Sequence, residues 1–406
     1  MSSMKWVNAF STHSSLEAAV REVSETAQQA LSQPADLGLV FISSAFSSEY
    51  SRLMPLLQEQ LNVSTLIGCG GGGAIGNGAD GNVPQEVEGL PALSLTLAHL
   101  PDVAIEAFHL LQQNFPDLDD PPERWTDLIG VFPEAQPQFI LLADPFSAGI
   151  NDLLSGLDYA YPGSAKIGGL ASAGMGNSGM SLFCNFKHYQ EGTIGVALSG
   201  KIAIETIVAQ GCRPIGQPYR VTQGESNVVL EVQSEQANEM AEEPQTPLVA
   251  LQNLLKLLSL EDRQLAQHSL FVGLARNEFK QDLDLGDFLI RNLIGVDPRA
   301  GAIAIGDRVR PGQRIQFHLR DATTSAEDLE MWLQQRCRPA SGALMFSCLG
   351  RGEGLYGQVN FESKLFNRYF QDVALGGFFC NGEIGPVGTS TFLHGYTSVF
   401  GICYQP

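Results

Sequence analysis

The side chains best suited to chemistry gather in three short segments near the C-terminus. Each segment adjoins an apolar run and contains glycine, which is typical of the strand ends where α/β folds open their binding crevices. Glycine lets the backbone approach a ligand closely and present its N–H groups. The candidate ligand-binding residues are Cys348, Arg351, Gly352, Asn381, Gly382, Glu383, His394 and Tyr396.

These residue types support three interpretations. A guanidinium can bind a carboxylate through two hydrogen bonds, and a glutamate can accept from an amine, so Arg351 and Glu383 could each bind one of these groups of a ligand. The two can instead form a structural ion pair with each other. In the third interpretation Cys348 is a thiolate nucleophile, His394 its base, and Asn381 or Glu383 the orienting group. A cysteine on an apolar strand is more often a small buried hydrophobe, so we expect binding rather than catalysis.

We expect no metal and no cofactor. The histidines show no His-x-x-x-His spacing and the seven cysteines no Cys-x-x-Cys spacing, which are common metal-site patterns. The stretch from Gly68 to Gly76 contains Gly-x-Gly-x-x-Gly, but "NGADGNVP" follows it and breaks helices. A dinucleotide fingerprint needs a helix at that point. We therefore expect a sharp turn or a loop that lines a cavity.

The elements that position these residues show an internal repeat. Residues 37–78 and 137–178 share an apolar strand, a turn with Phe-Ser, a helix and a Gly-rich turn. A weaker third copy spans residues 342–388, and repeat units of this kind pack against their copies. The matched positions are Phe46-Ser47 with Phe146-Ser147, Ile67-Gly68 with Ile167-Gly168, Gly76-Asn77 with Gly176-Asn177, Gly376-Gly377 with Gly168-Gly169, and Gly382 with Gly174.

The expected fold class is α/β (α+β), with repeated strand–helix–strand units that form mixed sheets flanked by helices. We expect two modules, residues 1–230 and 231–406, and helix–sheet–sheet–helix layers. Leu37–Ser43 reads as a buried strand, and a helix is expected after Ser14, with Ser14 and Glu17 as its capping box.

Composition narrows the function classes. The 406 residues carry a net charge of −20, which disfavours nucleic acid as a partner. The N-terminal residues show no signal-peptide pattern, and no apolar run reaches the ~18 residues that cross a bilayer. An odd number of cysteines without disulfide-like spacing is typical of a reducing compartment, so we expect a cytoplasmic protein.

Three segments resemble the landmarks of the FIST family: "GCRPIGQPYRVTQGESNVVLEV" (211–232), "MFSCLGRGEGLYG" (345–357) and "GFFCNGEIGPVGTSTFLHGYTSVFG" (377–401). The resemblance covers nearly the whole chain, as an N-terminal FIST module followed by a C-terminal one. The first Gly-rich turn departs from the family pattern, because it keeps Gly68-Cys69 but lacks the hydroxyl residue that usually follows. The residues that match the C-terminal pattern are Cys348, Gly350, Arg351, Gly352, Gly382, Glu383, Ile384, Gly385, Pro386, His394, Gly395 and Tyr396.

The resemblance implies a sensory protein that binds a small ligand, such as an amino acid or similar metabolite, and signals through a partner protein. Two alternatives stay open. One is a cysteine-dependent hydrolase that uses Cys348 and His394. The other is a non-catalytic scaffold for protein interaction.

Overall fold

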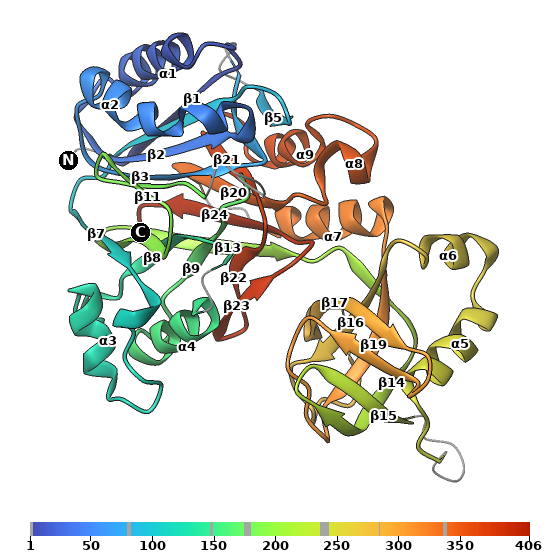
Figure 1. Cartoon of the computed structure of the whole chain (residues 1–406). Helices are drawn as coiled ribbons and strands as arrows, with labels where there is room; N and C mark the ends of the chain where they lie inside the picture. The colour runs from blue at the N-terminus through green and yellow to red at the C-terminus, as the bar shows by residue number, and fades with distance from the viewer. Residues whose placement is uncertain are drawn as a thin grey trace. The chain divides into compact units, whose positions relative to one another are not determined.

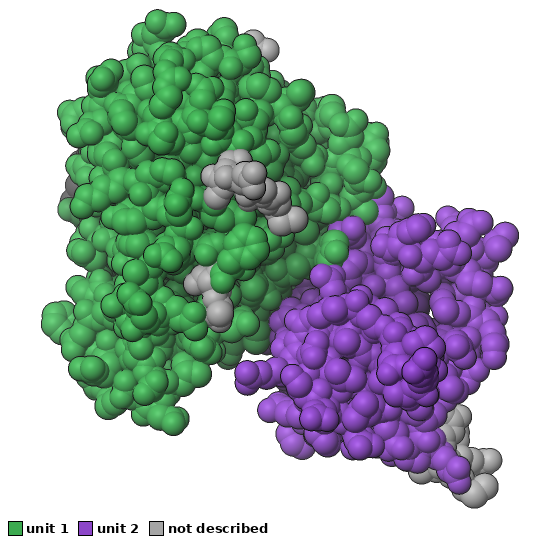
Figure 2. All heavy atoms as spheres, in the orientation of Figure 1, with its two compact units in different colours: residues 1–209, 330–406 green, residues 210–329 purple. Residues whose placement is uncertain are grey.

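The computed structural model describes residues 3–78, 83–146, 149–173, 180–235, 243–283, 285–335 and 339–406. The chain divides into two compact units (Figure 2): unit 1 comprises residues 1–209 and 330–406, and unit 2 comprises residues 210–329. Unit 2 is thus inserted between two segments of unit 1. The predicted boundary between modules 1–230 and 231–406 falls within strand β15 (Val228–Ser234) of unit 2. The bounds of the two modules remain a prediction.

Unit 1 is built on three six-stranded sheets, here called sheets 1, 2 and 3. In spatial order, sheet 1 contains β1 (Lys5–Ser11), β6 (Leu93–His99), β2 (Ala35–Ser43), β3 (Val63–Gly71), β10 (Leu182–Cys184) and β11 (Lys187–Tyr189). Sheet 2 contains β7 (Val103–Leu110), β12 (Thr193–Gly200), β8 (Gln138–Ala143), β9 (Lys166–Leu170), β22 (Glu383–Val387) and β23 (Ser390–His394). Sheet 3 contains β13 (Ala203–Ala209), β24 (Ser398–Tyr404), β20 (Gly342–Cys348), β21 (Leu375–Cys380), β4 (Gly73–Asn77) and β5 (Pro84–Glu88).

The three sheets share one strand arrangement. Each has a central parallel pair, which is β2–β3, β8–β9 or β20–β21. An antiparallel strand flanks one side of each pair, and a hairpin from another part of the chain flanks the other. The hairpin β4–β5 follows β3 but pairs in sheet 3, β10–β11 follows β9 but pairs in sheet 1, and β22–β23 follows β21 but pairs in sheet 2. This exchange links the three sheets.

The core lies between the sheets, and helices cover their outer faces (Figure 1). Side chains alternate along β2, where Leu39 and Phe41 join the central core while Val40 and Ile42 pack toward α1 and α2. The helices α3 and α4 pack in the same way on β8. The predicted mixed sheets, flanked by helices in helix–sheet–sheet–helix layers, are confirmed. The helices of unit 1 are α1 (Leu16–Leu31), α2 (Tyr50–Gln60), α3 (Pro122–Ile129), α4 (Ile150–Ala160), α8 (Gly352–Tyr356) and α9 (Phe361–Tyr369).

The predicted strand at Leu37–Ser43 is confirmed as β2, and the predicted helix after Ser14 is confirmed as α1. Its capping residue was predicted wrongly. Ser15, not Ser14, is the N-cap, and its hydroxyl accepts from the backbone N–H of Ala18. The two serines are equivalent in type, so their spacing from Glu17 alone favoured the wrong one.

The close approach of two parallel strands explains why the Gly-rich turn needs glycine at one of its positions. A Cβ on Gly68 would overlap the carbonyl oxygen of Val40 on the adjacent parallel strand. Gly168 and Gly377 meet the carbonyl oxygens of Leu141 and Met345 in the same way. Only glycine permits this approach, and Gly377, rather than Gly376, occupies the position of Gly168. The shared register supports the internal repeat, which stays a prediction. Ser147, Gly174 and Gly176-Asn177, which the repeat also matched, lie outside the described residues.

Unit 2 is a closed barrel of six strands. In spatial order they are β14 (Cys212–Glu225), β15, β18 (Ala302–Ile305), β17 (Phe288–Asp297), β16 (Leu270–Ala275) and β19 (Arg314–Arg320). The helices α5 (Pro247–Leu257) and α6 (Leu260–Leu265) belong to this unit, and the chain returns to unit 1 within α7 (Ala322–Gln334). In the part of the chain that the structure describes, no helix is both long and apolar enough to cross a membrane.

Candidate functional site

The predicted site residues lie where sheets 2 and 3 exchange strands. Because β21 belongs to sheet 3 and β22 to sheet 2, the link between them carries polar residues from one sheet to the other. Cys348 ends β20, Arg351 and Gly352 begin α8, Asn381 and Gly382 link β21 to β22, Glu383 begins β22, His394 ends β23, and Tyr396 precedes β24.

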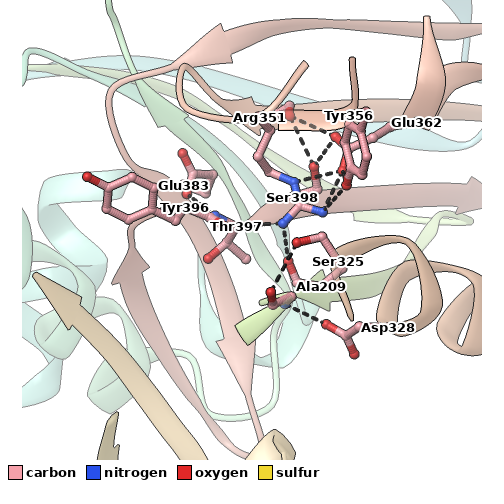
Figure 3. Close-up of polar contacts among 12 residues, drawn as sticks. Ala209, Ser325, Asp328, Arg351, Tyr356, Glu362, Glu383, Tyr396, Thr397 and Ser398 are labelled. Carbon is pink, nitrogen blue, oxygen red and sulfur yellow. Dashed lines mark hydrogen bonds and ion pairs between the residues drawn. The ribbon is translucent and has the colours of Figure 1, made fainter. Parts of the chain in front are cut away.

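Arg351 is the centre of a buried polar network (Figure 3). Its Nη2 lies 2.6 Å from Oε1 of Glu362 on α9, and both side chains are fully buried. Its Nε donates to the same oxygen at 2.7 Å, and its Nη2 donates to the Tyr356 hydroxyl at 2.7 Å. Its Nη1 donates to the backbone carbonyls of Tyr396 at 3.1 Å and Ala209 at 3.5 Å. The guanidinium is therefore surrounded by acceptors of its own chain.

The Glu362 carboxylate is equally well supplied with partners. Its Oε2 accepts from the Ser347 hydroxyl at 2.8 Å and from the Ser398 hydroxyl. Burial alone would raise the pKa of Glu362, but the charge of Arg351 and the hydroxyl donors outweigh burial and lower the pKa. The pair is thus ionised and fully hydrogen-bonded, which is the condition under which a buried ion pair is tolerated. Arg351 thus pairs with Glu362, whereas the alternative in the sequence analysis was an ion pair of Arg351 with Glu383.

Glu383 is buried in a different state. Its Oε2 accepts from the backbone N–H of Thr397 at 3.1 Å, while its Oε1 has no hydrogen-bond partner among the described residues. Burial raises the pKa of Glu383 well above its ordinary value, despite the Thr397 N–H and the charge of Arg351. Burial therefore disfavours the ionised form of Glu383, which is the form that an ammonium ligand would need.

The cysteine and histidine of the hydrolase alternative each contact backbone groups. The Cys348 thiol accepts from the backbone N–H of Gly350 at 3.4 Å. The Nε2 of His394 lies 3.0 Å from the carbonyl oxygen of Gly385. A carbonyl can only accept, so Nε2 carries the proton. Of the remaining predicted residues, Asn381 is exposed and its backbone N–H donates to Leu170 at 3.1 Å.

Two carboxylates on β5, which sequence analysis missed, cap the helices that carry this network. The Glu88 Oε1 accepts from the backbone N–H of Glu353 in α8 at 3.0 Å, where a Cβ on Gly352 would overlap it. The Glu86 Oε1 accepts from the backbone N–H of Ser363 in α9 at 2.6 Å. Burial, assisted by the nearby charge of Glu362, raises the pKa of Glu86 to about 7.

A cavity of about 570 Å³ lies at the carboxyl end of β8 and was not predicted. Asp144 follows β8 directly and is 7% exposed. Its Oδ1 accepts from the Phe146 backbone N–H at 3.0 Å, while its Oδ2 has no donor among the described residues. None of the lining residues is basic. The cavity is lined by Leu111, Gln112 and Gln113 of the segment after β7, by Asp144 and Phe146, and by Glu191 and Gly192 before β12.

The electrostatics of this cavity favour a positive ligand group. Burial, with a smaller contribution from the charge of Glu191, raises the pKa of Asp144 above its ordinary value, against the Phe146 N–H donor. A cation in the cavity would offset this cost of ionising Asp144. The signal available in the sequence was an aspartate at the carboxyl end of a buried parallel strand, in "LLADPFS". Within the described residues, no cluster of His, Cys, Asp or Glu has the arrangement of a metal site.

Comparisons with known proteins assign the chain to a family. The model of the FIST N domain matches residues 36–235, and that of the FIST C domain matches residues 250–386. An uncharacterized protein of Mycobacterium tuberculosis is 31% identical over 369 residues, which is 89% of each chain. An uncharacterized protein of Mycobacterium bovis is 33% identical over 268 residues, which cover 65% of this chain and 67% of the relative.

These matches confirm both predicted FIST modules. FIST domains are generally sensory, signal-transduction domains that bind small ligands. With both domain models matched in order and a relative similar along nearly nine-tenths of its length, this chain belongs to the FIST family.

Proposed function

We propose that this protein is a sensor that binds a small ligand in the cavity at the end of β8 and signals through a partner protein. The observation that carries the proposal is the cavity itself, with the nine-tenths-buried Asp144 on its wall. Its volume of about 570 Å³ lies in the range of small-molecule sites, which hold a few placed polar groups. An amino acid or a metabolite of similar size would fit.

The cavity is favoured over the C-terminal residues predicted from sequence. Arg351 was expected to grip a ligand carboxylate, but Glu362, Tyr356 and backbone carbonyls already surround its guanidinium. A ligand would have to displace an ionised partner from a fully buried site, which is strongly unfavourable. We propose that this network holds β20, β24 and α9 together.

Binding is also favoured over hydrolysis. The Cys348 thiol and the Nε2 of His394 are each engaged by backbone groups, as described above. A nucleophile and its base would need to direct these atoms toward a substrate.

The proposal includes a separate signalling partner and the cytoplasmic location expected from the cysteines.

The proposal can be tested by a thermal-shift screen of amino acids and small metabolites. A ligand at 100 times its Kd adds about 2.7 kcal/mol to the stability of the folded state. This corresponds to a rise in Tm of roughly 3–5 °C, because the entropy of unfolding grows with the length of the chain. The screen should use the parent protein, Asp144→Asn, and Asp127→Asn, which removes an exposed carboxylate of α3 outside the cavity.

We expect at least one compound to raise the Tm of the parent and of D127N but not that of D144N. A compound that stabilises all three proteins equally would place the ligand elsewhere. No response at millimolar concentrations would contradict the sensor proposal and favour the interaction scaffold.

A further inference from the structure

We infer that the cavity at the end of β8 takes a guanidinium or alkylammonium group, so that the ligand is an arginine-like or amine metabolite. This inference rests on the proposed function and names the ligand class of the same site. It follows from a comparison of two strand ends within unit 1, one of which contains a guanidinium of the chain itself.

The ends of β8 in sheet 2 and β20 in sheet 3 occupy matching positions. In sheet 2, Ala143 pairs with Thr193, and the next backbone N–H, of Asp144, donates to Gly192 at 2.9 Å. In sheet 3, Ser347 pairs with Ser398, and the next backbone N–H, of Cys348, donates to Thr397 at 3.1 Å. Asp144 therefore corresponds to Cys348, and Gly192 to Thr397.

The edge strands extend this match. Thr193 pairs with Leu110 on β7, and Ser398 pairs with Ala209 on β13. The carbonyls of Ala209 and Tyr396, which bind Nη1 of Arg351, therefore correspond to those of Leu110 and Glu191.

The two strand ends differ in what lies beside them. At the end of β20, the Arg351 guanidinium contacts both carbonyls, and Glu362 balances its charge. At the end of β8, the Glu191 carbonyl oxygen lies 2.9 Å from Nε2 of His109, and no arginine of the described chain lines the cavity beside it, whose wall includes Leu111, Glu191 and Gly192. The sequence from Asp144 to Asn151, "DPFSAGIN", contains no Lys or Arg that could fill this space as Arg351 does.

The groups around the cavity suit a cation supplied from outside. Asp144 offers its second carboxylate oxygen, Glu191 a second carboxylate, and Gln112 and Gln113 their side-chain amides. A guanidinium presents a planar fork of donors that matches the geometry of a carboxylate. An anionic ligand would meet two carboxylates, and none of the described lining residues is basic, so acidic metabolites should be rejected.

The probes are agmatine, L-arginine and L-citrulline, titrated into the full-length protein by calorimetry. Citrulline has the shape of arginine but carries a neutral urea group in place of the guanidinium. We expect agmatine and arginine to bind the parent and D127N with equal affinity, and citrulline to bind at least tenfold more weakly. Asp144→Asn should weaken agmatine binding at least tenfold. Glu191→Gln, at an exposed position, should weaken it severalfold even if D144N does not fold.

Several results would overturn the inference. Agmatine and arginine could fail to bind while the metabolite screen finds another ligand that depends on Asp144, in which case the sensor proposal stands and the cation inference falls. Equal affinity of agmatine for the parent, D144N and E191Q would place the amine elsewhere. Equal affinity for arginine and citrulline would remove the charge requirement. Failure of every compound in both experiments would contradict the proposed function itself.

Discussion

Replacing Arg351 by methionine should destabilise unit 1 severely. Both members of the Arg351–Glu362 pair are fully buried, and the change leaves an ionised carboxylate without its counter-charge. Breaking a buried pair from one side costs about 3–5 kcal/mol. At roughly 1.5–2 °C per kcal/mol for a unit of this size, the Tm should fall by about 5–10 °C.

The assay is urea and thermal unfolding followed by circular dichroism, on Arg351→Met, Glu362→Gln and the double variant. Each single variant leaves one group unpaired, so the double variant should lose less than the sum of the two losses. The coupling energy should be at least 1 kcal/mol, on the order measured for residues in one polar network. Arg52→Met is the control, because Arg52 forms solvent-exposed ion pairs with Glu17 and Glu49 in the same unit. Its Tm should stay close to that of the parent.

The reasoning would be refuted by an R351M protein that unfolds like the parent and has lost its ligand. That result would make Arg351 a ligand-binding group, as the sequence pattern had suggested, and Glu362 a passive neighbour. An additive double variant would show that the pair is not energetically coupled.

Three further predictions concern stability and pH. Glu86 has an ordinary pKa of 4.5 in the unfolded chain and about 7 when folded, so the folded state binds the extra proton and loses stability as the pH rises toward 7. Glu86→Gln keeps the acceptor oxygen without the charge. Urea unfolding should show that its free energy of unfolding, relative to that of the parent, rises by up to about 3 kcal/mol between pH 5 and 8. A difference in stability that does not change with pH would contradict the raised pKa. Gly68→Ala should lower the free energy of unfolding by at least about 2 kcal/mol because of its overlap with Val40. Gly395→Ala, where a Cβ meets nothing within 4 Å, should be tolerated, and equal urea midpoints for the two would contradict the close approach. Agmatine affinity, measured by calorimetry, should fall as the pH is lowered and Asp144 becomes protonated. Because the pKa of Asp144 is raised, this loss should begin at a higher pH than it would for an ordinary aspartate. Affinity that is independent of pH would exclude a carboxylate as the cation's partner.

Local patterns predicted much of the fold. A run of apolar residues predicted β2, and apolar residues at helical spacing predicted α1. Both predictions work because the spacing of apolar residues along the chain shows which face of an element is buried. The exchange of hairpins between sheets was not predictable in this way. It depends on pairing between strands far apart in the chain, such as Gly377 of β21 with Ile75 of β4, and no local pattern encodes the partner of a strand.

The ligand-binding role of the C-terminal residues stays a prediction. The segments around Arg351 and Glu383 lie close together, because Arg351 donates to the carbonyl of Tyr396 and Glu383 accepts from the N–H of Thr397. The partner of Arg351 was missed because Glu362, eleven residues later, reads as one more acidic residue at the start of an amphipathic helix. Nothing in the spacing shows that its side chain points inward. Asp144 was missed although it obeys the same strand-end rule, because the surrounding copy of the repeat contains fewer polar residues than the C-terminal one.

The most direct measurement is a crystal structure of the full-length protein with agmatine. We predict density for the guanidinium within hydrogen-bond distance of the Asp144 carboxylate, at the end of β8, with the Arg351–Glu362 pair intact. Density for agmatine beside Glu383, or an empty cavity at the end of β8 in crystals of a protein that binds agmatine in solution, would contradict the account.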